Sequence, residues 1–258
     1  MPSSLMCLFL ALGLSLVPVS LAEPSPSDAW TQARLKWEAG ELNSAQELLT
    51  QLVKVHESQG IRSSEPHYNL GRLFWQLKQP GKANYHLLKS AALSSSLLDT
   101  LSTVSTIEGI EREIGVREGV SEGISFSLYL LLKDNWLQGM LCVGLWGLIF
   151  AWLVSWLQGP RAKRAAILAA ILPIALILFS SLAYLFKKTM PRLAVIESTE
   201  NTRVIVYRDP EKRIEDKPVE LPSGTVITVG RTEKNFSEIL SPIYGWVEQT
   251  NLLIAPRS

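Results

Sequence analysis

The chain has 258 residues, of which 47% are apolar and 19% are charged, and its formal net charge is +1. Three blocks without Asp, Glu, Lys or Arg exclude a simple soluble globule and indicate a membrane protein: residues 1–22, 135–160 and 165–186. The near-zero net charge argues against a nucleic-acid-binding protein, which needs basic residues to neutralise phosphates. Cys7 and Cys142 both lie in the apolar blocks, so the polar regions offer neither a disulfide nor a thiol-redox centre.

The first block, residues 1–22, has the pattern of a secretory signal. Residues 5–17 are almost continuously apolar, and the small residues Ser20 and Ala22 suit cleavage after Ala22. No Lys or Arg precedes Arg34, so the usual basic start is missing, and an uncleaved N-terminal anchor is the alternative. With either interpretation, we expect the following segment to be exported.

The other two blocks predict transmembrane helices over 134–157 and 165–186. Each apolar core has 22 residues, Trp136–Leu157 and Ala165–Phe186, which is about 33 Å of helix and enough to cross a hydrocarbon layer of roughly 30 Å. Neither core contains an ionisable side chain, so the helices are predicted to be anchors and not an ion or proton path. Small residues are expected to let the two helices pack closely: Gly144, Gly147 and Ala151 on one, and Ala162, Ala166 and Ala170 on the other.

The loop between these helices, 158–164, contains Arg161, Lys163 and Arg164. The positive-inside rule makes such a loop cytoplasmic, although Lys187, Lys188 and Arg192 flank the other end of the second helix as strongly. The export signal decides between the two orientations. We therefore expect a protein of the bacterial cytoplasmic membrane with 23–133 and 189–258 both on the outer, periplasmic side, in contact with membrane lipid.

A repeat is visible between residues 23 and 95. A shift of 38 residues aligns Arg34 with Arg72, Trp37 with Trp75, Ala45 with Ala83 and Leu49 with Leu87, and it places Ala33 opposite Gly71. A small residue, then an aromatic residue, then Ala and a large apolar residue is the pattern of tetratricopeptide helix pairs. Chance periodicity in an ordinary helical bundle is the alternative.

Two such repeats bury little surface alone, so a capping element is expected in 96–133. Ser96 and Asp99 are spaced as a capping box, and six apolar residues follow at helical spacing: Leu97, Leu101, Val104, Ile107, Ile110 and Ile114. We expect Glu108, Glu111 and Glu113 on the solvated face of this helix. A polar joint (115–123) and a short interfacial helix (124–132) are expected to follow.

Residues 193–256 change to short strands rich in Val, Ile and Thr. The predicted strands are Leu193–Glu197, Thr202–Tyr207, Thr225–Gly230 and Phe236–Leu240, with another beginning at Gly245. The turn Leu221-Pro222-Ser223-Gly224-Thr225 and the strand Gly245-Trp246-Val247 together resemble a bacterial SH3-like domain, a small all-β barrel. The resemblance implies an aromatic groove formed by Tyr207, Tyr244 and Trp246; a Trp246 that only fills the barrel is the alternative.

Catalytic patterns are absent from the sequence. It contains no G-x-S-x-G, no phosphate-binding glycine loop and no H-E-x-x-H. His67 and His86 are spaced so that they could meet across a helix pair, but exposed polar residues are favoured over a metal site. We expect neither an enzyme nor a cofactor.

The order of signal, tetratricopeptide pair, two-span hairpin and SH3-like barrel resembles the BatE family of the Bacteroides aerotolerance operon. Tyr68–Gly71, the short basic loop and Gly245-Trp246-Val247 carry the resemblance, whereas the long stretch Asp209–Glu220 departs from it. The fold class is thus expected to be multidomain. The resemblance implies an envelope protein that works beside von Willebrand A-type membrane proteins and a MoxR-type ATPase in stress tolerance.

Two functions follow as expectations. In the first, the repeats and the barrel bind partner proteins as a scaffold, and Arg34, Asn69 and Arg72 line a groove that takes an acidic or C-terminal peptide. Solvated arginines without a partner are the alternative. In the second function, the barrel binds peptidoglycan as a wall sensor and the repeats are a spacer.

Overall fold

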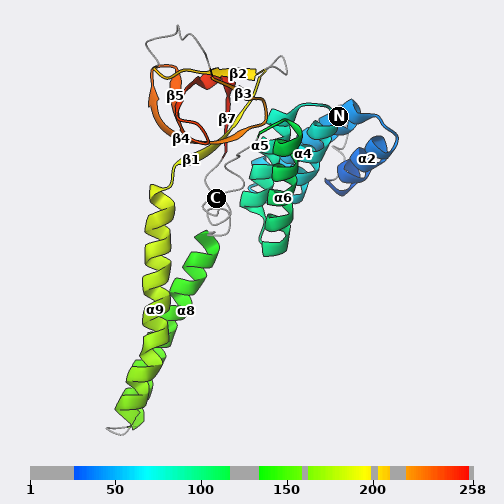
Figure 1. The fold of residues 1–258 in the computed structure, drawn as a ribbon. Helices are drawn as coiled ribbons and strands as arrows, with labels where there is room; N and C mark the ends of the chain where they lie inside the picture. Colours follow the sequence, from blue (N-terminus) through cyan, green and yellow to red (C-terminus); the bar gives the residue numbers. More distant parts are fainter. Residues whose placement is uncertain (1–25, 117–133, 159–161, 199–202, 210–218, 256–258) are drawn as a thin grey trace, which may run out of the picture. The chain divides into compact units, whose positions relative to one another are not determined.

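The computed structural model describes residues 26–116, 134–158, 162–198, 203–209 and 219–255 (Figure 1). The chain divides into two compact units, 1–52 and 53–258. The predicted signal, the joint and interfacial helix after residue 116, and residues 159–161 of the predicted inter-helix loop lie outside the described residues. The described part is a mixed chain of helices and antiparallel strands with two long apolar helices, as expected for the coarse architecture.

The first unit contains α2 (Pro26–Glu38) and the greater part of α3 (Leu42–Ser58). Gly40 adopts a left-handed φ of 79° in the turn between them, a conformation that glycine reaches without a steric penalty. Ala33, Ala45 and Leu49, three residues of the repeat pattern, are at most 1% exposed. The pattern therefore marks buried positions in this unit.

The second unit begins with the end of α3 and continues with α4 (Glu65–Gln76), α5 (Pro80–Leu93) and α6 (Leu97–Glu113). A Cβ added to Gly71 on α4 would lie 2.7 Å from Leu87 Cγ on α5, so only glycine allows this approach. Ala83 and Leu87 are fully buried beside it. The small and large residues of the second repeat thus do what their spacing predicts, which is to join two helices closely.

Helix α6 begins with the predicted cap, because Ser96 Oγ accepts a hydrogen bond from the Asp99 N–H at 3.3 Å. Val104, Ile107 and Ile110 are buried, but Leu97 and Leu101 are 46% and 43% exposed, so the expected apolar face is only half right. Helix α6 packs on α5, in the place where a cap was expected. In its first turn Thr100, and not Leu97, is the buried residue.

Helices α8 (Asp134–Gln158) and α9 (Ala162–Thr189) pack against each other along their length. A Cβ at Gly144 would lie 2.7 Å from Ile177 Cγ1, and one at Gly147 would lie 2.7 Å from Pro173 Cγ. Pro173 thus sits where the opposite helix has no side chain. Segments Leu137–Val154 and Ala169–Thr189 are long and apolar enough to cross a membrane, and most of their large apolar side chains face outward.

Among the residues described after α9, seven short antiparallel strands curve around one core (Figure 1). A five-stranded sheet has the order β6-β5-β4-β1-β7, and β2 pairs with β3. Tyr207 and Trp246 exchange backbone hydrogen bonds of 2.8 and 2.6 Å, which link the two sheets. The strand bounds are β1 (Arg192–Ile196), β2 (Arg203–Val206), β3 (Val219–Pro222), β4 (Val226–Glu233), β5 (Phe236–Ser241), β6 (Gly245–Glu248) and β7 (Leu252–Ile254). We call this region the strand domain.

The core of the strand domain comes from both sheets. Ala194, Ile196, Ile227, Ile239 and Val247 are all fully buried, and they meet Val204, Val206 and Leu221 of the two-stranded sheet. Gly224 has a φ of 98° in the predicted turn, where the Thr225 N–H donates to the Pro222 carbonyl at 3.2 Å. The five predicted strands are present; β3 and β7 were not predicted, because Val219–Pro222 and Leu252–Ile254 are too short for a clear alternation.

Helices α5 and α6 contact the strand domain through two buried side-chain hydrogen bonds, which we call the helix–strand junction. The Asn84 side-chain amide on α5, which is fully buried, donates to the Gly224 carbonyl at 2.7 Å. The Glu111 carboxylate on α6 accepts a hydrogen bond of 2.8 Å from the Val226 N–H. Glu111 is 2% exposed, so its expected place on a solvated face is wrong: the carboxylate is buried because it satisfies the backbone amide at the start of β4.

Candidate functional site: a pocket beside Lys89 and Glu57

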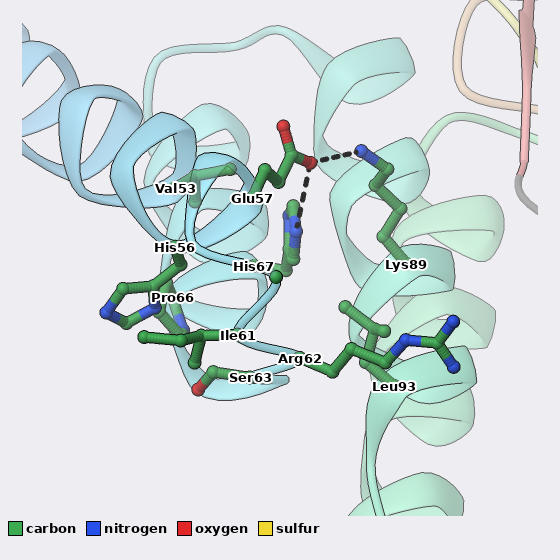
Figure 2. Close-up of a pocket in the computed structure, with 11 residues that line it drawn as sticks. Val53, His56, Glu57, Ile61, Arg62, Ser63, Pro66, His67, Lys89 and Leu93 are labelled. Carbon is green, nitrogen blue, oxygen red and sulfur yellow. Dashed lines mark hydrogen bonds and ion pairs between the residues drawn. The ribbon is translucent and has the colours of Figure 1, made fainter.

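A cavity of about 300 Å³ lies where the end of α3, the following loop, the first turn of α4 and the last half of α5 meet (Figure 2). All of its lining residues belong to the second unit. Val53, Ile61, Pro66 and Leu93 give it apolar walls. Its polar lining includes His56, Glu57, Arg62, His67 and Lys89. A volume of this size is at the lower end of small-molecule sites.

Glu57 is the centre of the polar side of this pocket. Lys89 Nζ donates a hydrogen bond to Glu57 Oε1 at 3.0 Å, and His67 Nε2 lies 3.9 Å from the same oxygen. Figure 2 shows the Lys89 and His67 side chains converging on this carboxylate from α5 and α4. The Lys89 side chain is 20% exposed and that of Glu57 is 54% exposed. The cation is therefore a fixed part of the wall, whereas the carboxylate approaches it from the solvent side.

Behind Lys89 lies a pair of histidines. His67 Nδ1 and His86 Nδ1 are 3.1 Å apart, so with neutral rings one nitrogen donates a hydrogen bond and the other accepts it. Burial, with the nearby Lys89 charge, lowers the pKa of His67 to about 4. Burial together with His67 and the Lys89 and Lys82 charges lowers the pKa of His86 to about 3. The prediction of exposed polar histidines is wrong for His67, which is 3% exposed in the α4–α5 interior.

The Lys89 ammonium keeps its charge in this setting. Burial opposes the charge, but the hydrogen bond to Glu57 and the neighbouring Tyr85 outweigh it and raise the pKa of Lys89 above its ordinary value. Lys89 Nζ also lies 5.4 Å from the centre of the Tyr85 ring. At neutral pH the pocket lining thus contains the Lys89 and Arg62 cations beside the neutral His67 ring, with His86 next to His67.

One further polar atom of the pocket stands out. His56 Nδ1 is buried, and it has no hydrogen-bond partner among the residues that the structure describes. A buried polar atom without a partner is uncommon in folded proteins. Within the described ranges, no three His, Cys, Asp or Glu side chains gather as a metal site would require.

The arginines expected to bind a partner lie in different units. Arg34 of the first unit is exposed and pairs with Glu38 one turn away, Nε to Oε1 at 2.8 Å, which raises the pKa of Arg34. Arg72 of the second unit is exposed and lies over the Tyr68 ring, 5.9 Å from its centre. Asn69 Nδ2 donates to the Glu65 carbonyl within its own helix at 3.0 Å. The Asn69 amide is thus already bonded along α4, while both arginines remain at the surface.

The three aromatic residues expected to form a groove differ in burial. Trp246 is 5% exposed, although the core cluster that includes its neighbour Val247 does not include it. Tyr207 is half-buried and meets Phe236 edge-on at 5.7 Å, and Tyr244 is 61% exposed. The Tyr244 hydroxyl donates to Glu238 Oε1 at 2.9 Å. Only Tyr244 is therefore presented fully to solvent.

Glu238 braces this part of the surface. Its carboxylate, 6% exposed, also accepts hydrogen bonds from the Arg231 N–H at 3.1 Å and from Arg231 Nε at 3.3 Å. The hydrogen bonds from Arg231 have the larger effect and that from Tyr244 the smaller, and together they hold the pKa of Glu238 below its ordinary value. Arg231 and Tyr244 are thus held in place beside each other on the strand domain.

The pocket residues Glu57 and Lys89 were not predicted from the sequence. The signal that could have found them is the spacing of His67 and His86, which already indicated a meeting across a helix pair. Lys89 follows His86 by three residues and so lies on the same face of α5. Glu57 lies before a loop, and no local pattern ties it to that face.

No family of known proteins, no curated protein and no solved structure matches this chain. The resemblance to the BatE family accordingly rests on the residues named for it.

Proposed function

We propose that the chain is a membrane-anchored adaptor of the bacterial cell envelope, without enzymatic activity, that holds partner proteins through tetratricopeptide-type helix pairs and an SH3-like strand domain. The BatE resemblance gives the partners their class: von Willebrand A-type membrane proteins and a MoxR-type ATPase system, acting in stress tolerance. Close packing at Gly71 and Leu87 supports the helix pair, and the curved seven-stranded domain supports the barrel.

The helix–strand junction is the observation that carries this proposal. Asn84 and Glu111 join the helices to the strand domain by hydrogen bonds that are inaccessible to water, at 2.7 and 2.8 Å. Buried hydrogen bonds of this kind fix geometry, because breaking one leaves an unsatisfied polar group. A second helix pair and a strand domain that keep one orientation within the second unit are what an adaptor needs and a flexible spacer does not.

The outward apolar surface of α8 and α9 supports the anchor. Trp146, Trp152, Phe150, Leu172 and Leu182 are each at least 67% exposed, an arrangement that water opposes and lipid favours. We propose that both soluble regions lie on the outer side of the cytoplasmic membrane. Protease added to spheroplasts is expected to cleave both and to spare the hairpin; protection of one region alone contradicts this topology.

Crosslinking in intact cells tests the adaptor function. A photoreactive residue at position 72, on the exposed face of α4, is expected to capture discrete membrane proteins that the same residue at Lys54 on α3 does not capture. The Glu111→Ala variant is expected to reduce capture at position 72 only modestly but to prevent simultaneous capture through position 244. Equal yields from positions 72 and 54 contradict the proposal.

A wall sensor is the second candidate, and the braced pair Arg231–Tyr244 favours it. An exposed aromatic ring beside a held guanidinium suits a sugar and a carboxylate, both of which peptidoglycan contains. Sedimentation of the full chain in detergent with purified peptidoglycan separates the functions. If the wild type co-sediments with peptidoglycan, and Tyr244→Ala does not while Arg72→Ala does, the result supports the sensor. A wild-type chain that does not co-sediment excludes the sensor.

A further inference from the structure

We propose that the pocket between α3, α4 and α5 binds a small aliphatic carboxylate, with Lys89 as its anchoring cation and Glu57 as a built-in competitor that occupies Lys89 when the ligand is absent. This ligand site is separate from the surfaces that the adaptor function uses, and it does not depend on that function.

The shape of the pocket gives the aliphatic part of the ligand. Its volume of about 300 Å³ is bounded by Val53, Ile61, Pro66 and Leu93. Val53 is 7% exposed and Pro66 is buried, so these walls are fixed by the helices that carry them. A branched chain of four to six carbons fits a space of this size, and its burial against apolar walls favours binding.

The charged side chains of the pocket indicate that the ligand has a carboxylate. Lys89 Nζ and the Arg62 guanidinium are the cations of the pocket lining, and Lys89 Nζ is paired with Glu57 Oε1 at 3.0 Å. Glu57 is 54% exposed, so it can return to water without losing buried contacts. A ligand carboxylate that replaces the Glu57 carboxylate leaves Lys89 paired. The replacement costs little free energy, because a half-exposed ion pair contributes little stability.

His67 completes the recognition. His67 Nε2 lies 3.9 Å from the oxygen that Lys89 binds, so a carboxylate at this place comes near a second polar group. The cavity, the displaceable Glu57 and the nearby His67 nitrogen are three separate observations that point to one ligand.

Titration of the full chain in lipid nanodiscs with 4-methylpentanoate, followed by saturation-transfer NMR, tests the site. The neutral isostere 4-methylpentanamide and empty nanodiscs are the controls. We expect the acid to bind about tenfold or more tightly than the amide, because the amide cannot replace the charge of Glu57. Equal binding of acid and amide, or no acid signal above empty nanodiscs, overturns the proposal.

Paired variants distinguish a ligand site from a structural ion pair. Lys89→Gln is expected to weaken acid binding by about tenfold or more, and Lys54→Gln, an exposed lysine outside the pocket, to leave it unchanged. Glu57→Gln removes the competitor, so it is expected to tighten binding several-fold. A purely structural pair predicts the opposite, and weaker binding by Glu57→Gln therefore overturns the proposal even where Lys89→Gln does not fold.

A second ligand identifies the source of the carboxylate. N-acetyl-glycyl-leucine has the same carboxylate and branched chain at the end of a peptide. If it binds more tightly than 4-methylpentanoate, in the same Lys89-dependent way, the natural ligand is the end of a polypeptide. If it binds more weakly, the natural ligand is a free small acid. Binding of either that does not depend on Lys89 contradicts the proposed anchor.

Discussion

Two glutamates show how differently the same side chain is used at the two ends of the helical region. At the helix–strand junction, Glu111 is 2% exposed and accepts a hydrogen bond from the backbone amide of Val226. At the pocket, Glu57 is 54% exposed and pairs with a lysine side chain. The first carboxylate cannot leave without exposing an unsatisfied group, whereas the second can exchange with another anion. Burial and the kind of partner, not the residue type, separate a structural contact from a binding site.

Acidification is expected to give the largest loss of stability, in α4 and α5 beside the pocket. The folded pKa values of His67 and His86, about 4 and about 3, lie below the ordinary value of 6.5, so protons bind the unfolded α4–α5 pair more strongly. The two neutral histidines make their full contribution to the free energy of unfolding above pH 6.5. This contribution is lost as the pH falls through 6.5 toward the folded pKa values of about 4 and about 3. Between pH 7 and pH 5 the loss is on the order of 4 kcal/mol for the two groups.

Hydrogen exchange of peptides from 65–93 in the full chain, corrected for the intrinsic pH dependence, measures this loss. The double variant His67→Leu/His86→Leu is the control, and it is expected to retain only the pH dependence of the other groups. Equal pH dependence in variant and wild type means that the two histidines do not cause the loss.

Removal of the Glu111 carboxylate is expected to have the next largest effect, at the junction. Glu111→Ala leaves the Val226 N–H without its acceptor and opens a space, at a cost of about 3 kcal/mol. Thermal unfolding of the full chain in nanodiscs, with hydrogen exchange at β4, measures it. Glu111→Gln retains an acceptor oxygen and is expected to keep most of the stability, and exposed Glu113→Gln to keep all of it. A Glu111→Ala variant as stable as Glu113→Gln removes the contrast between the two glutamates.

Two glycine-to-alanine substitutions test the close contact between α4 and α5. Gly71→Ala places a Cβ 2.7 Å from Leu87 Cγ and 3.0 Å from the Ala83 carbonyl, and is expected to destabilise α4–α5 by about 1–3 kcal/mol. Gly109→Ala, in α6 with nothing within 4 Å of its Cβ, is expected to stabilise its helix by roughly 0.5–1 kcal/mol. Hydrogen exchange of the two helices gives both values, and the same sign for both contradicts this prediction.

The smallest expected effect is that of Glu57→Gln on stability. Its ion pair with Lys89 is half-exposed, so the variant is expected to differ from wild type by less than about 1 kcal/mol. Thermal unfolding at neutral pH measures it beside Glu111→Ala. A loss as large as that of Glu111→Ala means that the two glutamates are used alike, and that Glu57 is not displaceable.

The sequence predicted elements better than it predicted contacts between them. Apolar periodicity and length locate α8, α9 and five of the strands, because each signal is complete within a few consecutive residues. The small-residue pattern likewise predicts the close approach at Gly71. The sequence misplaced Glu111, since a glutamate on an amphipathic helix has the same local pattern whether it faces water or a distant strand amide.

The candidate site was less predictable for the same reason. His67 and His86 are separated by 19 residues and meet across one hairpin, so their approach could be expected. Lys89 and Glu57 are separated by 32 residues and a loop, and their pairing depends on where the loop places the end of α3. For Trp246, the residue type favours an exposed binding role, but the side chain is only 5% exposed.

The junction also sets an order in time. Glu111 and Asn84 find their partners 115 and 140 residues later in the chain, after both apolar helices have been made. At roughly 5–20 residues per second, a nascent chain waits on the order of ten seconds for β4 to emerge. During synthesis the Glu111 carboxylate and the Asn84 amide therefore lack these partners until the turn at Gly224 and the start of β4 have been made. A ribosome stalled between α9 and β4 is expected to hold α5 and α6 without these two hydrogen bonds.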